Sequence, residues 1–291
     1  MGVNEGTVTG YAKILDNGPD GDRWNLVVLA EGYLDSQMAN FHLHALEIVN
    51  ALTSTPPFDG LSSAINVHRV DIASNEEGAD DPTACSGGTG AAVNTYLDAS
   101  FCGQPSRRDL LTVDDDLAVQ TAFDRVINTH AVLVLVNTRV YGGSGGDSGS
   151  VGVAVASLHP AAFNVAMHEL GHSAFGLADE YDDTTDAQPH HPAPEPAEGN
   201  VTLEGTYPAI KWNGLVDSST PMPTQENGDC DVSNSTPSPV PAGTVGAFAG
   251  ADNYHCDVYR GEYSCKMRSL QQPFCAVCQD IINAVLFPFF P

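Results

Sequence analysis

The sequence is poor in basic residues. Among its 291 residues, 11 are Lys or Arg and 37 are Asp or Glu, which gives a formal net charge of −26 at pH 7. A surface of this sign repels nucleic-acid phosphates and anionic lipid headgroups. We therefore expect neither nucleic acid nor an anionic membrane surface as a partner.

Long apolar runs are absent as well. No uninterrupted stretch approaches the roughly 20 apolar residues that a membrane-spanning helix needs, so we expect no membrane insertion. The opening residues, MGVNEGTVTG, lack the charged-then-apolar layout of a secretory leader. Since a secreted protein needs such a leader, we expect this chain to be a mature form or one from which the leader has been removed.

Cysteine, in contrast, is plentiful. This usage is unusual for a reduced cytosolic enzyme, and it favours disulfides and a secreted, extracellular protein. Cys85 and Cys102 bracket a Gly- and Ser-containing loop that a disulfide between them would close. A structural zinc site made by the last four cysteines is the alternative, but it has a single Cys-x-x-Cys pair where zinc ribbons have two. The seven cysteines are Cys85, Cys102, Cys230, Cys256, Cys265, Cys275 and Cys278.

The segment His168-Glu169-Leu170-Gly171-His172 carries the strongest chemical signal. Two histidines four residues apart on a helix project from one face about one turn apart, which is the spacing that two imidazoles need to bind one tetrahedral Zn²⁺. Glu169 then lies beside the metal, where its carboxylate can take a proton from water. We predict His168 and His172 as metal ligands and Glu169 as the general base.

A third ligand is expected shortly after this helix. Gly176 can adopt the left-handed conformation that ends a helix and turns the chain back. Asp179 lies three residues after this glycine, the offset at which the metzincin pattern His-Glu-x-x-His-x-x-Gly-x-x-His puts its third ligand. The sequence departs from the pattern by one extra residue before the glycine and by a carboxylate in place of the last histidine. The spacing favours Asp179, with Glu180 or a distant residue as alternatives.

The rest of the chain alternates between strand and helix patterns. This order predicts a sheet with helices packed on it, in which the metal helix comes last. A long Gly-, Asp- and Ser-rich loop is expected over residues 74–112, and strand character returns over residues 200–212. The predicted elements are strands at residues 24–30, 65–72, 130–137 and 151–158, and helices at residues 35–53 and 114–129. The apolar stripe of the helix at 35–53 includes Phe41, Ala45, Ile48, Val49 and Leu52.

Residues 141–150 contain two tags that superficially suggest a serine hydrolase. Ser144 stands in Gly-x-Ser-x-Gly and Ser148 in Gly-Asp-Ser-Gly. A nucleophile elbow needs a helix directly after the serine, whereas a strand is predicted here. We interpret these residues as a flexible loop beside the active-site cleft, and a serine hydrolase remains an alternative that lacks a recognisable His and Asp pair.

The segment that follows the metal helix is polar and rich in proline. We interpret the adjacent His190 and His191 as part of a solvated loop. The acidic residues Asp182, Asp183 and Asp186 are candidate Ca²⁺ ligands, but they lack the spacing of a known calcium loop.

Several blocks of the sequence resemble the bacterial IgA-cleaving metallopeptidases, a zincin family. The resemblance implies an α+β, metzincin-like fold with a mixed twisted sheet and packed helices, including the metal-binding helix. It implies an upper catalytic subdomain over residues 1–181 and an irregular lower subdomain over residues 182–291, with a methionine turn and a C-terminal helix. The blocks are NLVVLAEGY at 25–33, GADDP at 78–82, the segment 168–181, CKMR at 265–268 and FCAVC at 274–278.

The resemblance also assigns roles to individual residues. His168, His172 and Asp179 are expected to bind Zn²⁺, with Glu169 as the base and Met267 in the turn beneath the metal. An ordinary core methionine is the alternative for Met267. The implied activity is zinc-dependent endopeptidase cleavage of extracellular proteins or peptides, and cleavage of immunoglobulin itself does not follow.

Two points stay open at the level of sequence. An oxyanion donor is expected, and Tyr181, Tyr259 and Tyr263 are the candidates. The alternative to an enzyme is a catalytically inactive zinc-binding recognition or adhesion module on the same scaffold, in which Glu169 would be dispensable.

Overall fold

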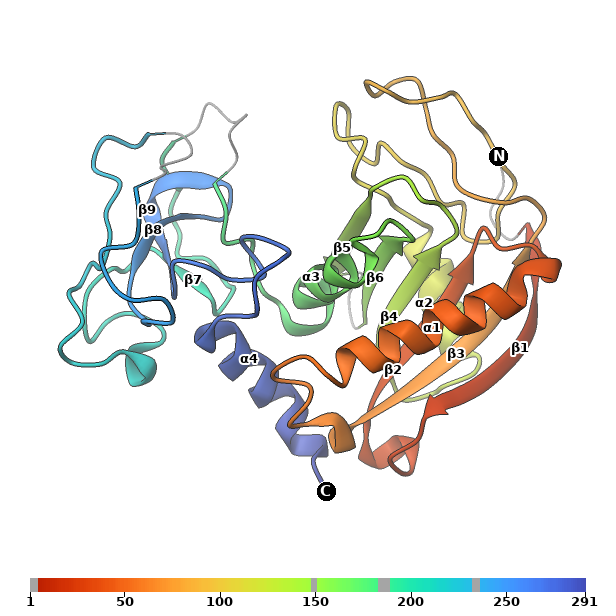
Figure 1. Ribbon diagram of the computed structural model, residues 1–291, viewed down its shortest axis with the longest axis horizontal. Coiled ribbons are helices and arrows are strands. Elements are labelled where there is room, and N and C mark those ends of the chain that lie inside the picture. Colours follow the sequence, from red (N-terminus) through yellow and green to blue (C-terminus); the bar gives the residue numbers. More distant parts are fainter. Residues whose placement is uncertain (1–4, 148–150, 183–188, 232–235) are drawn as a thin grey trace. The chain divides into compact units, whose positions relative to one another are not determined.

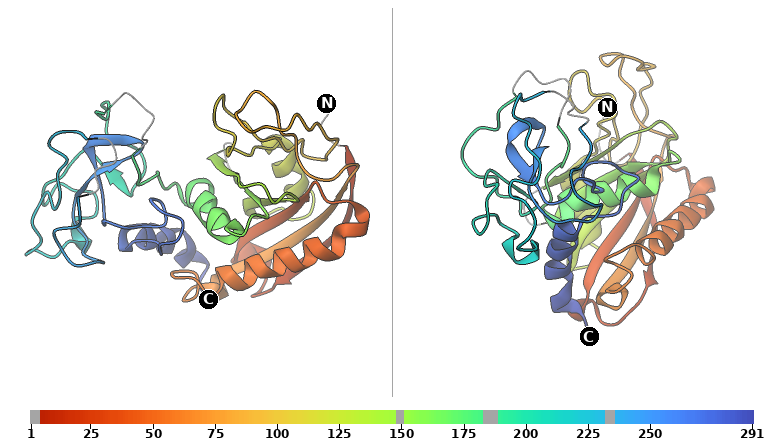
Figure 2. Two further views of the ribbon diagram at one scale, coloured as in Figure 1. Left: turned by 45° about the horizontal axis from the view of Figure 1, so that its top comes forward. Right: turned by 60° about the vertical axis from the view of Figure 1, so that its left-hand side comes forward.

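The computed structural model describes residues 5–147, 151–182, 189–231 and 236–291. The chain forms two compact units (Figures 1 and 2). The first comprises Met1–Ala174 and Leu286–Pro291, and the second comprises Phe175–Val285. The functional division after residue 181 remains a prediction.

The first unit is built on a six-stranded mixed sheet. Its order is β1-β3-β2-β4-β6-β5, with the four inner strands parallel and both edge strands antiparallel to their neighbours. Every residue of β2 and β6 is buried, as expected of strands covered on both faces. The strands are β1 (Gly6–Leu15), β2 (Trp24–Glu31), β3 (Ile65–Ser74), β4 (Thr129–Val136), β5 (Gly143–Asp147) and β6 (Gly152–Ser157).

Helices α1 (Met38–Leu52) and α2 (Asp115–Phe123) cover opposite faces of this sheet (Figure 1). The crossover from β2 to β3 and that from β3 to β4 run in opposite directions, and right-handed crossovers then place their helices on opposite sides. Helix α2 is shorter than predicted, and the Asp114 carboxylate caps its start by accepting from the Leu117 N–H at 2.9 Å. Helix α1 buries the predicted stripe of Phe41, Ala45, Ile48, Val49 and Leu52.

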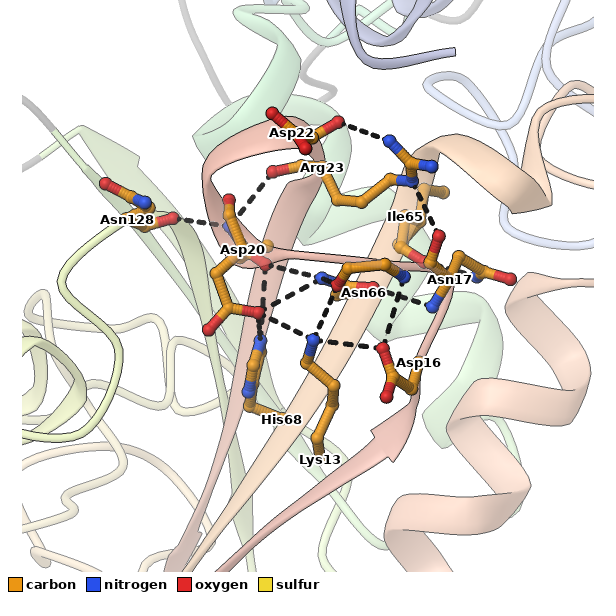
Figure 3. Close-up of polar contacts among 12 residues, drawn as sticks. Lys13, Asp16, Asn17, Asp20, Asp22, Arg23, Ile65, Asn66, His68 and Asn128 are labelled. Atoms are coloured by element: carbon orange, nitrogen blue, oxygen red, sulfur yellow. Dashed lines mark hydrogen bonds and ion pairs between the residues drawn. The ribbon is translucent and has the colours of Figure 1, made fainter. Parts of the chain in front are cut away.

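A polar network closes the sheet at the amino-terminal ends of its parallel strands (Figure 3). The Asp20 carboxylate is its centre, at 2.8 Å from Lys13 Nζ, 3.2 Å from Asn66 Nδ2 and 3.5 Å from His68 Nε2. Asn66 and His68 are fully buried, so these contacts satisfy side chains that water does not reach. The network fixes the turn before β2, at the amino-terminal ends of the parallel strands. The chain enters the metal helix from the other end of the sheet, after the carboxyl end of β6.

The long loop at residues 75–112 is attached to the sheet at the carboxyl ends of the parallel strands. Glu31, the fully buried last residue of β2, accepts backbone N–H groups from Leu97 at 2.9 Å and Ala99 at 3.1 Å. Gly32 has φ of +66° and passes so close to the carbonyl of Gly78 that a side chain would not fit. The predicted disulfide between Cys85 and Cys102 is confirmed.

One strand, β1, was not predicted, and two sequence-based expectations about strands were wrong. Residues 141–150 were interpreted as a flexible loop, but Gly143–Asp147 form edge strand β5, because pairing with β6 overrides the low strand propensity of glycine. The strand expected over residues 200–212 is limited to Val201–Thr202.

The second unit contains a small antiparallel sheet in the order β7-β9-β8. Its strands are β7 (Val201–Thr202), β8 (Phe248–Ala251) and β9 (Tyr254–Arg260), and helix α4 spans Ala276–Leu286. A disulfide joins Cys230 to Cys256. In the described part of the chain, no helix is long and apolar enough to cross a membrane.

Candidate active site

Helix α3 (Ala162–Phe175) follows β6 directly and carries the predicted metal motif. Ala166 and Leu170 of this helix are buried, whereas Phe163 is only half-buried. Gly176 follows the helix with φ of +60°, as predicted for a glycine that ends it.

The two histidines of the motif face each other. Their Nε2 atoms lie 3.2 Å apart, and their ring planes are almost perpendicular, at 88°. Two nitrogens that each bind a tetrahedral Zn²⁺ at about 2.0–2.1 Å lie about 3.3 Å apart. His168 is 8% exposed and His172 is half-buried, so the pair is partly shielded from water. The donor set and its spacing fit one metal ion.

Strand β5 passes unusually close to the turn of α3 that carries Glu169. A Cβ atom at Gly145 would lie 2.5 Å from the Glu169 carbonyl oxygen, and one at Gly143 would lie 3.2 Å from Glu169 Oε1. Only glycine allows this approach of strand to helix. The hydroxyl of Ser144 on the same strand donates to the Leu111 carbonyl at 2.6 Å, which is a structural hydrogen bond.

Tyr141 lies within electrostatic range of Glu169 and was not identified from the sequence. Burial raises the pKa of its phenol, and the negative charges of Glu169 and Asp109 raise it further. The phenol is therefore a neutral O–H donor at neutral pH. Its ring contacts that of His159 edge to face, with centroids 5.3 Å apart. Its position immediately before the glycine-rich strand was the available signal.

The two candidates for the third ligand, both in the second unit, have different environments. Glu180 is fully buried; its N–H donates to the Met267 carbonyl at 2.8 Å, and its Oε1 accepts from Asn200 Nδ2 at 3.1 Å. Burial raises the pKa of the Glu180 carboxyl well above its usual range. Asp179 is half-buried, and its carbonyl accepts the Asp252 N–H at 2.8 Å. The engagement of Glu180 inside the second unit favours Asp179, whose role as a zinc ligand stays a prediction.

Met267 lies in a tight turn of the second unit. The Cys265 carbonyl accepts the N–H groups of Arg268 at 3.0 Å and Ser269 at 2.9 Å, and Met267 itself is fully buried. Because its carbonyl binds the backbone of Glu180, this turn packs on the segment that carries Asp179. These contacts agree with the predicted methionine turn without testing its position under a metal.

Other sequence-based expectations are resolved in the second unit. The disulfide of Cys256 excludes it from the four-cysteine zinc site considered above. His190 and His191 pair with Asp257 at 2.7 Å and Asp252 at 3.0 Å. The hydroxyl of Tyr263, one of the three predicted oxyanion donors, donates to the Thr236 carbonyl at 3.0 Å. Ser148, Asp183 and Asp186 lie outside the described residues.

Comparison with known proteins places the chain in a family. No curated protein matches the sequence. The family model described as IgA Peptidase M64 matches residues 12–236 and 234–286, which together cover most of the chain. The protein therefore belongs to the IgA peptidase M64 family of metallopeptidases.

Proposed function

We propose that the protein is a zinc-dependent endopeptidase that cleaves extracellular proteins or peptides. His168, His172 and Asp179 would hold the zinc, and Glu169 would be the general base. The observation that carries this proposal is the 3.2 Å separation of the two Nε2 atoms on the helix turn that also bears Glu169. Family membership supports the same reaction class.

Each side chain has a defined part in peptide hydrolysis. Zinc, when bound, would polarise the scissile carbonyl and lower the pKa of water to about 7. The Glu169 carboxylate accepts a proton as the water oxygen adds to the carbonyl carbon, and it returns this proton to the nitrogen as the C–N bond breaks. The neutral O–H of Tyr141 would donate to the oxygen that becomes negative, as an alternative to the predicted Tyr181 and Tyr259.

Strand β5 offers a place for an extended substrate. It is the last strand of its sheet, and beyond the contact of Gly143 with Leu110, no strand in the described ranges pairs with its outer edge. An extended peptide can add to such an edge through main-chain hydrogen bonds. A peptide bound there would run beside the turn of α3 that carries Glu169. The two disulfides support an extracellular location.

Metal analysis combined with cleavage of an unstructured peptide library tests this proposal. Glu169→Gln should keep its zinc and its thermal stability but lose at least ~100-fold in kcat, since a general base contributes that much. Asp179→Ala should lose one zinc equivalent per chain, whereas the control Asp217→Ala, at an exposed carboxylate, should lose none. Unchanged zinc content in Asp179→Ala would overturn its role as a ligand.

The alternatives predict different results. A recognition module would bind zinc yet cleave no peptide, and its partner binding would survive Glu169→Gln. A serine hydrolase would react with a serine-directed phosphonate and resist chelators. We expect the opposite pattern, with cleavage abolished by chelator and unaffected by the phosphonate.

A further inference from the structure

Three cysteines that form no disulfide gather around one glutamate in the interior of the second unit. Cys265, Cys275 and Cys278 are buried with free thiols, and Glu180 is buried with them. One ligand atom from each of the four lies within 4.8 Å of the other three. Glu180 is 98 residues from Cys278 in the sequence, so the cluster joins distant parts of the chain.

The spacing of the donor atoms matches a tetrahedral zinc site. Cys265 Sγ and Cys278 Sγ are 3.6 Å apart, and Glu180 Oε1 lies 3.1 Å from Cys278 Sγ and 3.6 Å from Cys275 Sγ. With Zn–S of about 2.3 Å and Zn–O of about 2.0 Å, tetrahedral geometry gives about 3.8 Å between sulfurs and about 3.5 Å between sulfur and oxygen. A [4Fe–4S] cluster holds each of its cysteines on a different iron atom and so farther apart.

One atom of the cluster lacks a hydrogen bond. Glu180 Oε2 is buried and has no hydrogen-bond partner among the residues that the structure describes. A buried carboxylate oxygen in this state is costly unless a donor or a cation reaches it. Oε1 already accepts from Asn200, so the carboxylate is held in one orientation towards the thiols.

Two of the sulfurs accept hydrogen bonds from backbone N–H groups, as metal-bound sulfurs commonly do. The Cys275 N–H donates to Cys265 Sγ at 3.3 Å, and the Cys278 N–H donates to Cys275 Sγ at 3.4 Å. Helix α4 begins at Ala276, so Cys275 directly precedes its positive end and Cys278 lies in its first turn.

Two buried basic side chains lie close enough to act on the cluster electrostatically. Arg260 and Lys266 are each 3% exposed, and they interact with Glu180 and Cys265 respectively. Three thiolates and one carboxylate carry four negative charges, which a divalent cation and these two side chains would balance. Burial of so many charges requires this kind of compensation.

We propose that Cys265, Cys275, Cys278 and Glu180 bind a structural Zn²⁺ ion. Four protein ligands complete a tetrahedral shell and leave no position for a substrate, which is the arrangement of a structural rather than a catalytic site. The ion would tie the turn that contains Met267 and the start of α4 to the segment after α3. This proposal is independent of the catalytic zinc proposed above.

The first test uses all 291 residues of the chain and leaves the cluster unchanged. X-ray absorption at the zinc edge should show Zn–S distances of about 2.3 Å in the native protein. The double variant His168→Ala/His172→Ala should keep about one zinc per chain, where the native protein holds about two. Cobalt in this variant should show an intense sulfur-to-metal charge-transfer band, which histidine and carboxylate ligands do not produce. Absence of Zn–S distances in the native protein would overturn the proposal.

The second test changes the cluster. Cys278→Ser should lose one zinc equivalent and the charge-transfer band, and Glu180→Gln should weaken zinc retention against a chelator by at least ~10-fold. The control Cys85→Ala/Cys102→Ala removes a disulfide in the first unit and should keep both the zinc equivalent and the charge-transfer band. A thiol titration of the unfolded native chain that finds one thiol instead of three would indicate a disulfide between two of these cysteines and refute the site. If the native protein shows Zn–S distances but cleaves no peptide, the result would count only against the proposed function.

Discussion

The substitution Asp81→Asn should destabilise the first unit through the long loop at residues 75–112. Arg108 holds the Asp81 carboxylate with two hydrogen bonds, at 2.9 Å from Nε and 2.7 Å from Nη2, and the Thr89 N–H adds a third at 3.0 Å. Asp81 is 5% exposed, so water replaces little of this interaction. These contacts, with Arg108 as the main cause, lower the pKa of Asp81 from 3.8 to about 2.

The size of the effect follows from this pKa. Each pKa unit corresponds to about 1.4 kcal/mol, so the carboxylate contributes roughly 2 kcal/mol at neutral pH. Arg108 is partly exposed, which reduces the expected loss in Asp81→Asn to about 1–2 kcal/mol. Because the folded-state pKa is depressed, this stability is present above about pH 4 and is lost as the pH falls towards about 2.

Urea unfolding at neutral and acidic pH measures the effect. Asp81→Asn should lower the free energy of unfolding at pH 7, and the difference from the native chain should shrink as the carboxylate of the native chain is protonated. The control is Asp109→Asn, which removes an exposed pair with Arg107 and should change stability by less than about 0.5 kcal/mol. Equal losses in both variants, or a difference that persists at acidic pH, would refute the reasoning.

Three further predictions concern the first unit. Gly145→Ala should lower both Tm and kcat, because its Cβ would meet the α3 backbone, whereas Gly146→Ala, with no described atom within 4 Å of the added Cβ, should change neither. Tyr141→Phe should keep its metal and lose about 100-fold in kcat, as expected when one donor to a developing oxyanion is removed, and an unchanged kcat would exclude that role. Cys85→Ala/Cys102→Ala should lower the free energy of unfolding by about 3 kcal/mol in denaturant titrations, from the entropy of the opened loop, and a loss below about 1 kcal/mol would contradict this.

Local patterns predicted much of the first unit. The apolar spacing in helix α1 named its five buried positions, and the continuous apolar runs of β2 and β4 marked central strands. The metal motif was equally predictable from the sequence, because only the geometry of one helix brings His168 and His172 to the same face.

The misses have a common physical cause, which is tertiary pairing. Strand β1 is an edge strand with partly exposed side chains, so it lacks the apolar run that marked the inner strands. Strand β5 consists mostly of glycine and is a strand only because β6 and α3 lie against it. Propensity and periodicity do not carry such information.

Tertiary pairing also explains why the sequence grouped Cys256 with the wrong cysteines and did not predict the position of Glu180. Spacing in the sequence grouped Cys256 with the last three cysteines and left Glu180 as an alternative ligand for the catalytic metal. In the fold, Cys256 pairs with Cys230, and Glu180 joins the remaining thiols across 98 residues. No local rule links a carboxylate to cysteines at that separation.

The close approach of the sheet to helix α3 limits how this sequence can vary. Gly145 and Gly152 face the helix backbone at Glu169 and Ser173, at distances that leave no room for a Cβ atom, and Gly143 is crowded by Val165. In a library of all single substitutions, these three positions should therefore tolerate no other amino acid, although Gly143 and Gly145 lie on an edge strand rather than in the core. Laboratory evolution of the enzyme would have to leave them unchanged and seek new properties in the surrounding loops.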